Sequence, residues 1–331
     1  MPTAGNTPNS QLLMDIRGLK KYFPIQGGLF LKEVASIRAL DGVDLYLRPK
    51  EIVGLVGESG CGKTTLGRLV CMLEPPTAGS IEFEGSDILG MEPKEQRELR
   101  KRIQMIIQDP FGSLNPRWTV KDIIGEPLKV FSRLSKKEYT ERVLELMSLV
   151  GLGREHMNRF PHEFSGGQRQ RISIARSIIL NPDLVVADEP VSALDVSIQA
   201  QILNLLIELQ DRFSLSYLFI SHDLRVIEFL SDRIAVMYLG KVIETAPNQE
   251  LQKSPLHPYT QSLLAAIPNP DPKVQQEEAI IRGEVPSPIN IPAGCRFHPR
   301  CSSRVKACME SEPPLLEVAP DHWVACHLHV S

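Results

Sequence analysis

The stretch Val53-Gly-Leu-Val-Gly57-Glu-Ser-Gly60-Cys-Gly62-Lys63-Thr64-Thr65 decides how this chain folds. The apolar run over 52–56 is typical of a buried strand, and residues 63–73 continue as a helix that stops at two prolines. Between them lies the pattern G-x-x-x-x-G-K-T. Its glycines let successive N–H groups point at an anion, and the helix N-terminus adds its dipole. We therefore predict a phosphate-binding loop, with Lys63 reaching the phosphates and the Thr64 hydroxyl available to Mg²⁺.

The composition limits the class of protein. The chain has 331 residues, enough for about two domains, and is 42% hydrophobic and 23% charged, as soluble globular proteins are. A net charge of −3 gives no broad basic surface for nucleic acid. No apolar run approaches the roughly 18 residues that span a bilayer, and Met1–Asn9 lacks the apolar centre of a signal peptide. We expect a cytosolic protein whose membrane role, if it has one, comes through partner chains.

Apolar strands and helices alternate along most of the chain. We predict an opening strand at 12–22, a loop or hairpin at 27–37, a strand at 38–47, further strands at 80–84, 103–107, 184–187, 217–220 and 234–239, and helices at 92–102, 165–178 and 199–212. Such alternation is typical of a parallel sheet with helical crossovers. A helical block at 119–180 interrupts it, which predicts a separate helical lobe over about residues 109–182.

An acidic pair follows one of these predicted strands, in Leu184-Val-Val-Ala-Asp188-Glu189. A carboxylate at the end of a buried strand beside a phosphate loop can hold Mg²⁺ directly or through water. The next carboxylate can polarise a water molecule for attack on a phosphate. The alternative is a solvated acidic strand end, which the presence of the phosphate loop disfavours.

The segment Phe164-Ser-Gly-Gly-Gln168 opens a predicted helix. Ser165 followed by two glycines exposes the free N–H groups of the helix N-terminus, so the segment can bind a second anion. Taken alone, the same residues could equally be an ordinary helix cap.

Taken together, these motifs resemble those of the ABC-transporter ATPases. The corresponding segments are Gly57–Thr65 (Walker A), Gln108 (Q-loop), Phe164–Gln168 (signature), Leu184–Glu189 (Walker B), Ser192–Asp195 (D-loop) and His222 (switch histidine). The resemblance implies an α/β P-loop NTPase fold. It would have a RecA-like parallel-sheet core, an antiparallel β subdomain, a helical subdomain and here a small Cys-rich C-terminal extension.

The resemblance also implies the site residues for ATP and Mg²⁺. The chain's own nucleotide contacts would be Phe23 (with Tyr22 as the competing aromatic), Gly57, Glu58, Ser59, Gly60, Cys61, Gly62, Lys63, Thr64, Thr65, Gln108 and Asp188, with Thr64, Gln108 and Asp188 near Mg²⁺. Glu189 would be the catalytic base, His222 would contact the γ-phosphate, and Gln108 would couple the attacking water to the helical lobe. Taken singly, His222 and Gln108 would each more often be structural.

In this family two ATPase domains close head to tail around two ATP molecules. The chain shows no obvious second cation for the γ-phosphate, and the N–H groups of a partner's signature helix would supply donors there. The residues of that surface are Ser165, Gly166, Gly167 and Gln168.

Three further segments resemble the dipeptide/oligopeptide importer subfamily: Gln108–Arg117, His257–Ala265 and Gly283–Cys295. They imply a nucleotide-binding domain at residues 1–255 and a C-terminal extension at 256–331. Within the extension, the polar composition of Asn269–Glu278 predicts a linker. The implied partners are a homologous ATPase (a heterodimer), two membrane permease subunits and an extracytoplasmic peptide-binding protein, with the chain on the cytoplasmic side of the membrane. Other importer substrates (nickel, glutathione), a soluble ABC ATPase acting on nucleic acid and a regulatory protein without catalysis stay open as alternatives.

Four of the six cysteines crowd into the end of the chain, as Cys295-x5-Cys301-x6-Cys308-x17-Cys326. Clustered cysteines in a cytosolic chain favour a metal site over disulfides. Zinc sites commonly use tight pairs about two to four residues apart, which are missing here, so the spacing favours an iron–sulfur cluster. The subfamily resemblance implies a four-iron (4Fe-4S) cluster, while zinc, disulfides and free thiols stay open. Neighbouring Arg296, Arg300, Arg304 and Lys306 could offset cluster charge, and His298, His322, His327 and His329 could replace a cysteine.

Overall fold

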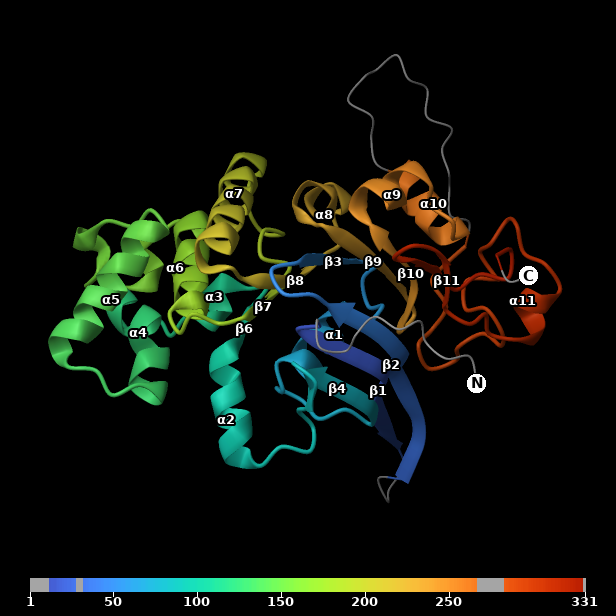
Figure 1. The fold of residues 1–331 in the computed structure, drawn as a ribbon, viewed down its shortest axis with the longest axis horizontal. Helices are drawn as coiled ribbons and strands as arrows, with labels where there is room; N and C mark the ends of the chain where they lie inside the picture. The colour runs from blue at the N-terminus through green and yellow to red at the C-terminus, as the bar shows by residue number, and fades with distance from the viewer. Residues whose placement is uncertain (1–11, 28–31, 267–282, 330–331) are drawn as a thin grey trace, which may run out of the picture.

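The computed structural model describes residues 12–27, 32–266 and 283–329. The predictions for Met1–Asn9 and for the linker at Asn269–Glu278 lie outside this part. The centre of the described chain is an eight-stranded sheet in the order β11-β12-β10-β9-β3-β8-β7-β6 (Figure 1). Its strands are β3 (Ile52–Val56), β6 (Ile103–Ile106), β7 (Leu184–Asp188), β8 (Ser216–Ser221), β9 (Arg233–Tyr238), β10 (Lys241–Pro247), β11 (Leu316–Ala319) and β12 (His322–Val324).

The middle of this sheet is parallel, as predicted. Strand β3 pairs in parallel with β8 and β9, and β7 pairs in parallel with β8 and β6. The carboxyl ends of parallel strands meet at one edge of a sheet, so the residues that follow β3, β6, β7 and β8 are gathered there. Strand β10 then pairs antiparallel with β9 through a hairpin turn at Gly240.

A second, antiparallel sheet has the order β2-β1-β4-β5. Its strands are β1 (Met14–Gly27), β2 (Lys32–Leu47), β4 (Ala78–Phe83) and β5 (Ser86–Asp87). The predicted hairpin at 27–37 is confirmed, because β1 and β2 are antiparallel and pair at Gly27–Lys32, and β2 begins at Lys32 rather than at the predicted residue 38. Cross-strand pairs such as Phe23–Ile37 and Ile25–Ala35 extend the ladder. Pro24 is tolerated because β4 pairs with β1 only as far as Lys20, which leaves this end of β1 at an edge.

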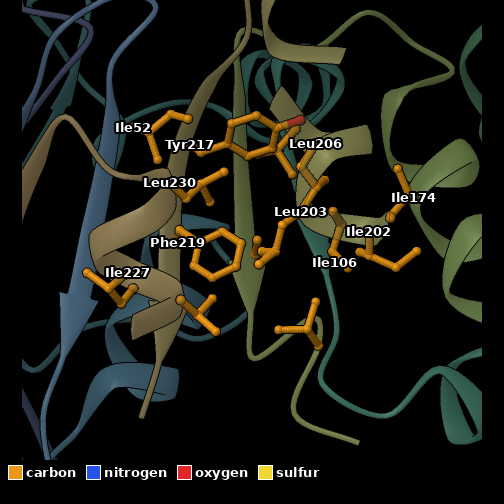
Figure 2. Packing of buried hydrophobic residues seen from close by; sticks show 14 of the residues in the cluster. Ile52, Ile106, Ile174, Ile202, Leu203, Leu206, Tyr217, Phe219, Ile227 and Leu230 are labelled. Atoms are coloured by element: carbon orange, nitrogen blue, oxygen red, sulfur yellow. The ribbon is translucent and has the colours of Figure 1, made fainter. Parts of the chain in front are cut away.

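Helix α1 (Lys63–Val70) packs between the two sheets. Leu66, Leu69 and Val70 are fully buried there with side chains of β1, β2 and β4 on one side and of β3, β7, β8 and β9 on the other. The opposite face of the main sheet carries Ile52, Tyr217 and Phe219, which pack against helices α7 (Val196–Phe213) and α8 (Leu224–Leu230) (Figure 2). Burial on both faces explains why the central strands read as continuous apolar runs.

The helical lobe lies at one end of the sheet, on the left of Figure 1. It contains α3 (Pro110–Ser113), α4 (Val120–Phe131), α5 (Lys136–Leu149), two short 3-10 turns (Arg154–His156 and Pro161–Glu163) and α6 (Gly166–Ile178). The predicted helical block is therefore interrupted at residues 132–135, where Ser135 caps α5 and exchanges hydrogen bonds with Glu138. Helix α2 (Pro93–Arg102) precedes the lobe and matches its prediction.

The C-terminal part lies at the other end of the sheet (Figure 1). Three short helices in the second half of the chain escaped sequence prediction: α8, α9 (Asn248–Lys253) and α10 (Pro258–Ala265). The tail adds α11 (Ala307–Glu310) and the pair β11–β12, and β12 pairs with β10 at Glu244–Val324 and Thr245–Trp323. The extension is thus continuous with the main sheet.

Candidate active site

The phosphate-binding loop runs from the end of β3 into α1, where the sequence placed it. Gly62 is the N-cap of α1 and has a φ of 108°, and a Cβ built on it would lie 2.3 Å from the Ala39 carbonyl oxygen. Only glycine fits that combination of left-handed backbone and close approach. The Cys61 carbonyl accepts a hydrogen bond from the Gly240 N–H at 2.9 Å, so the β9–β10 turn supports the loop from below.

Lys63 closes the loop on itself. Its buried Nζ donates to the carbonyl oxygens of Gly57, at 2.7 Å, and Glu58, at 3.1 Å. The Cys61 thiol lies 3.8 Å from the same Nζ, and burial raises the pKa of that thiol. An ammonium group held this way is already aimed into the loop, where a phosphate oxygen would replace a carbonyl partner.

The hydroxyl of Thr64 and the carboxylate of Asp188, the two candidate Mg²⁺ ligands, lie next to each other. The Thr64 Oγ1 donates to Asp188 Oδ1 at 3.1 Å, across 124 residues of sequence. Asp188 ends β7 and is 2% exposed, and this burial raises the pKa of its carboxyl group. A pair of hard oxygen ligands beside a phosphate loop is the donor set that Mg²⁺ prefers.

Glu189 is held by two other predicted residues. Its Oε2 accepts a hydrogen bond from Gln108 Nε2 at 2.9 Å and lies 3.1 Å from His222 Nδ1. A carboxylate can only accept, so the imidazole carries its proton on Nδ1 in this arrangement. Glu189 also has a φ of 46°, an uncommon conformation for a residue with a side chain. The structure therefore joins Gln108, Glu189 and His222 from the ends of three neighbouring strands.

The signature segment forms the predicted helix start. Ser165 Oγ accepts from the Gln168 N–H at 3.3 Å, and Gln168 Oε1 accepts from the Ser165 N–H at 3.1 Å, which is a complete capping box. Within the described residues, none of these hydrogen bonds reaches the phosphate-binding loop. A Cβ on Gly167 would lie 2.5 Å from Ile198 Cγ2, so the second glycine permits close packing of α6 on α7.

The two candidate aromatics differ in their contacts. The Tyr22 hydroxyl donates a hydrogen bond to Asp41, and the Arg38 guanidinium lies over its ring at 5.8 Å. Phe23, the next residue along β1, has Lys21 Nζ 5.0 Å from its ring centroid. Successive strand residues point to opposite faces, so only one of the two rings can face a bound base.

Sequence reasoning missed a set of contacts from the C-terminal part to the phosphate-binding loop. The Arg300 guanidinium makes two parallel bonds to the Glu58 carboxylate, at 2.8 and 3.0 Å. The Glu58 N–H donates to the Tyr259 hydroxyl at 3.0 Å. The ion pair joins residues 242 positions apart, and no local pattern relates Glu58 to Arg300, so no signal in the sequence could have found it.

The predicted four-cysteine metal site is not formed as a single-ion site. Across the described ranges, which include all six cysteines, no three His, Cys, Asp or Glu side chains gather where one metal ion could be held. All six cysteines are free thiols, which argues against the disulfide alternative. Burial raises the pKa of Cys295 to about 11, and Cys308, Cys326 and Cys301 lie near enough to raise it further. The four thiols therefore share one region without meeting at one point.

In the described part of the chain, none of the helices combines the length and the apolar character that crossing a bilayer would require.

Two family models match the sequence. One, described as "ABC transporter", covers residues 40–192, and the other, described as "Oligopeptide/dipeptide transporter, C-terminal region", covers residues 243–308. Among curated proteins, the oligopeptide transport ATP-binding protein AppF of Bacillus subtilis (strain 168) is 52% identical over 324 residues, which is 97% of this chain and 98% of AppF. The dipeptide transport ATP-binding protein DppF of Haemophilus influenzae is 49% identical over 321 residues, 97% of each chain.

Solved structures share the fold. The ATP-binding cassette MJ0796, in a dimeric post-hydrolysis state with ADP and Pi, superposes with a TM-score of 0.63 at 27% identity. The match covers 71% of this chain and 98% of MJ0796. Clostridium perfringens CbiO1 gives the same TM-score at 24% identity over 74% of this chain and 92% of its own, a likeness of fold alone.

Proposed function

The chain belongs to the oligopeptide/dipeptide transport ATP-binding proteins of the ABC transporter family, and we propose that it binds and hydrolyses ATP to power a membrane importer of di- and oligopeptides. The observation that carries the ATPase assignment is the convergence of Lys63, Thr64, Asp188, Glu189 and Gln108 at the carboxyl edge of the sheet. These residues bring a phosphate loop, a hard-cation ligand pair and a carboxylate base into one place.

Each group has a separate task in the proposed reaction. The loop N–H groups and Lys63 bind the β- and γ-phosphates, and Phe23 stacks on the adenine. Thr64, Asp188 and Gln108 would hold Mg²⁺, which when bound neutralises charge that develops on the phosphate oxygens. The remaining loop residues that we assign to ATP are Gly57, Glu58, Ser59, Gly60, Cys61, Gly62 and Thr65.

Glu189 acts as the general base in this proposal. Water attacks the γ-phosphorus in line, the new P–O bond forms as the bond to the ADP oxygen breaks, and the water proton passes to the Glu189 carboxylate. In the structure Glu189 Oε2 contacts Gln108 and His222. For Glu189 to act as the base, Gln108 must move to contact the attacking water and His222 must move to contact the γ-phosphate. Gln108 follows β6 beside the helical lobe, and its movement would couple the lobe to the nucleotide.

The γ-phosphate is completed by a partner chain. Ser165, Gly166, Gly167 and Gln168 of a homologous ATPase would cap it from the opposite side, and the dimeric form of the related cassette MJ0796 supports such a pairing. The two ATPases would bind two permease subunits at the cytoplasmic side of the membrane. The permease subunits would receive peptide from an extracytoplasmic binding protein.

A Glu189→Gln variant tests the catalytic assignment. We expect ATP binding to be retained and turnover in the assembled complex to fall by about 10²–10⁴, because the amide keeps the shape but cannot take the proton. Steady-state phosphate release and ATP binding are measured on the same preparation. Hydrolysis at the wild-type rate would exclude Glu189 as the base.

Affinity purification of the tagged chain from membranes tests the importer assignment. Two permease subunits should co-purify and nucleic acid should not. Capture of nucleic acid with no membrane protein would favour the soluble-ATPase alternative.

We also propose that residues 256–331 form an extension in which Cys295, Cys301, Cys308 and Cys326 bind a 4Fe-4S cluster. The support is the donor set: four free thiols, of which Cys301, Cys308 and Cys326 lie near enough to Cys295 to raise its pKa. Bound, such a cluster would cross-link a small segment that has little core of its own. Anaerobic purification followed by iron, sulfide and zinc analysis decides the point. One zinc per chain without iron would contradict the cluster.

A further inference from the structure

Besides Tyr259, the Arg300 side chain of the cysteine-rich extension reaches the phosphate-binding loop. Arg300 lies directly before Cys301 in sequence, and its side chain is 6% exposed. Its two terminal nitrogens meet the two oxygens of Glu58, in the fork-to-fork geometry that makes Arg–carboxylate pairs strong and directional.

The rest of the surroundings keep this pair in place. The Tyr238 hydroxyl lies 3.4 Å from Arg300 Nη1, and the Tyr238 ring packs on the Tyr259 ring at a centroid distance of 4.8 Å. Tyr259 in turn accepts the backbone N–H of Glu58. The first residue after Gly57 is therefore fixed at both its backbone and its side chain by groups that lie outside the nucleotide-binding motifs.

The carboxylate of Glu58 is electrostatically unfavourable in a loop that binds a triphosphate. It carries the same sign of charge as the ligand, and like charges at short range in a partly dry site cost affinity. The Glu58 side chain is 25% exposed, so water screens it only in part. The paired guanidinium cancels that charge and prevents the side chain from swinging toward the phosphates.

We infer that Arg300 is a positioning residue for ATP: from the cysteine-rich extension it neutralises Glu58 and holds the start of the phosphate-binding loop in its ligand-ready form. This inference rests on the proposed ATP-binding function and adds to it a route from the extension to the nucleotide. Without Arg300, ATP binding must reorder the loop and overcome an unpaired carboxylate.

Binding of a fluorescent methylanthraniloyl-ATP with Mg²⁺ to the full chain tests the inference. We expect Arg300→Gln to weaken binding about tenfold, the effect of losing one strong charge-assisted pair. In the double variant Glu58→Gln/Arg300→Gln the unpaired carboxylate is gone, so the affinity should be higher than that of Arg300→Gln alone. In the assembled complex Arg300→Gln should raise the KM for ATP and leave kcat near the wild-type value.

A second ion pair between the extension and the core supplies the matched control. Asp321 accepts from Arg48 Nη2 at 2.6 Å and from the Tyr46 hydroxyl at 2.9 Å, far from the phosphate-binding loop in sequence and without a bond to it. Asp321→Asn weakens docking of the extension in the same way but should leave the affinity for the nucleotide unchanged. Thermal unfolding of each variant shows whether the fold is kept, and Arg300→Lys, which keeps the charge, covers the case in which Arg300→Gln does not fold.

The possible outcomes distinguish failure of the inference about Arg300 from failure of the proposed ATP-binding function. A wild-type chain that binds no nucleotide overturns both. A wild-type chain that binds, with Arg300→Gln binding equally well, overturns the inference alone. So does an equal loss in Asp321→Asn, or a double variant no better than Arg300→Gln, since either result would reduce Arg300 to a general structural support.

Discussion

At the scale of single residues, the same carboxylate chemistry is used in two opposite ways. Asp188 is buried at the end of β7, where the Thr64 hydroxyl is its hydrogen-bond partner within the described ranges, and burial raises the pKa of its carboxyl group. Glu189, the next residue, is bound by an amide and an imidazole. The first carboxylate is costly to keep charged without a cation, and the second is already satisfied.

This difference predicts a conflict between stability and function at Asp188. A carboxyl group whose pKa is raised on folding binds its proton more tightly in the folded chain. The stability it contributes is present below its unfolded pKa and is lost as pH rises through the folded pKa. At neutral pH, Asp188→Asn should therefore stabilise the nucleotide-free chain by about 1 kcal/mol, or about 2–4 °C in Tm, while abolishing Mg²⁺-dependent ATP binding.

Differential scanning of the nucleotide-free chain at pH 7 and at pH 4 measures the effect. The gain over wild type should shrink at the lower pH, where the wild-type carboxyl takes up its proton. An Asp188→Asn chain that melts below wild type at pH 7 would contradict the argument.

Residue identity in the site could be predicted because each motif is local. Lys63, Thr64, Asp188 and Glu189 lie in short patterns whose chemistry is fixed by spacing. Their partners could not be predicted, because the hydrogen bond between Gln108 and Glu189 depends on how parallel strands are ordered. For Arg300 the sequence offered only a positive charge among cysteines, and we expected it to balance a cluster, whereas the structure pairs it with Glu58.

At the scale of elements, close packing of one strand against one helix controls the centre of the sheet. Gly54 lies in the middle of β3, and a Cβ built on it would fall 2.4 Å from Ser231 Oγ and 2.5 Å from Ile227 Cγ2 on the α8 side. Strand β3 carries the phosphate-binding loop at its end, so displacement of α8 also displaces that loop.

Gly54→Ala should therefore destabilise the chain by about 1–3 kcal/mol through overpacking. Gly90→Ala is the matched control. The nearest atom to a Cβ at Gly90 is 3.6 Å away, and the residue lies in an exposed turn, so the change should be close to neutral. Urea unfolding of both variants gives the two free energies, and equal values would contradict the packing argument.

Element type was predictable where the local pattern was clear, as in the continuous apolar run of β3, the dense charge of α2 and the apolar spacing of α6. The errors follow from tertiary context. Residues 32–37 gave no clear strand signal, yet they pair with β1 across a long ladder. Helices α8, α9 and α10 have at most eight residues each, too few for a 3.6-residue period to stand out, and packing rather than propensity stabilises them.

At the scale of the whole molecule, the two ends of the sheet present different surfaces. The helical lobe carries the signature helix at one end, and the cysteine-rich extension continues the sheet through β12 at the other (Figure 1). In the proposed pair, the signature helix serves the partner's ATP and not the ATP bound by its own chain. A substitution of Ser165 should then impair ATP hydrolysis by the assembled complex without weakening ATP binding to the isolated chain.

The lobe offers two serines that suit this test. Ser165 caps α6 and Ser135 caps α5, and each forms a capping box with the residue three positions on. Replacing either with Arg removes one cap, at a cost of about 1 kcal/mol, and places a bulky cation at a helix start. The isolated chain should bind ATP normally in both cases, because in the described structure neither serine bonds to the phosphate-binding loop.

The assembled complex should distinguish them. Ser165→Arg should abolish the hydrolysis that depends on the partner's nucleotide site, since its side chain fills the space where the partner's γ-phosphate would dock. Ser135→Arg should lose no more activity than its lower stability explains. ATP binding to the isolated chains and phosphate release by the complexes provide the comparison. If Ser165→Arg also prevented the isolated chain from binding ATP, the signature helix would be serving its own site, and the head-to-tail arrangement would be wrong.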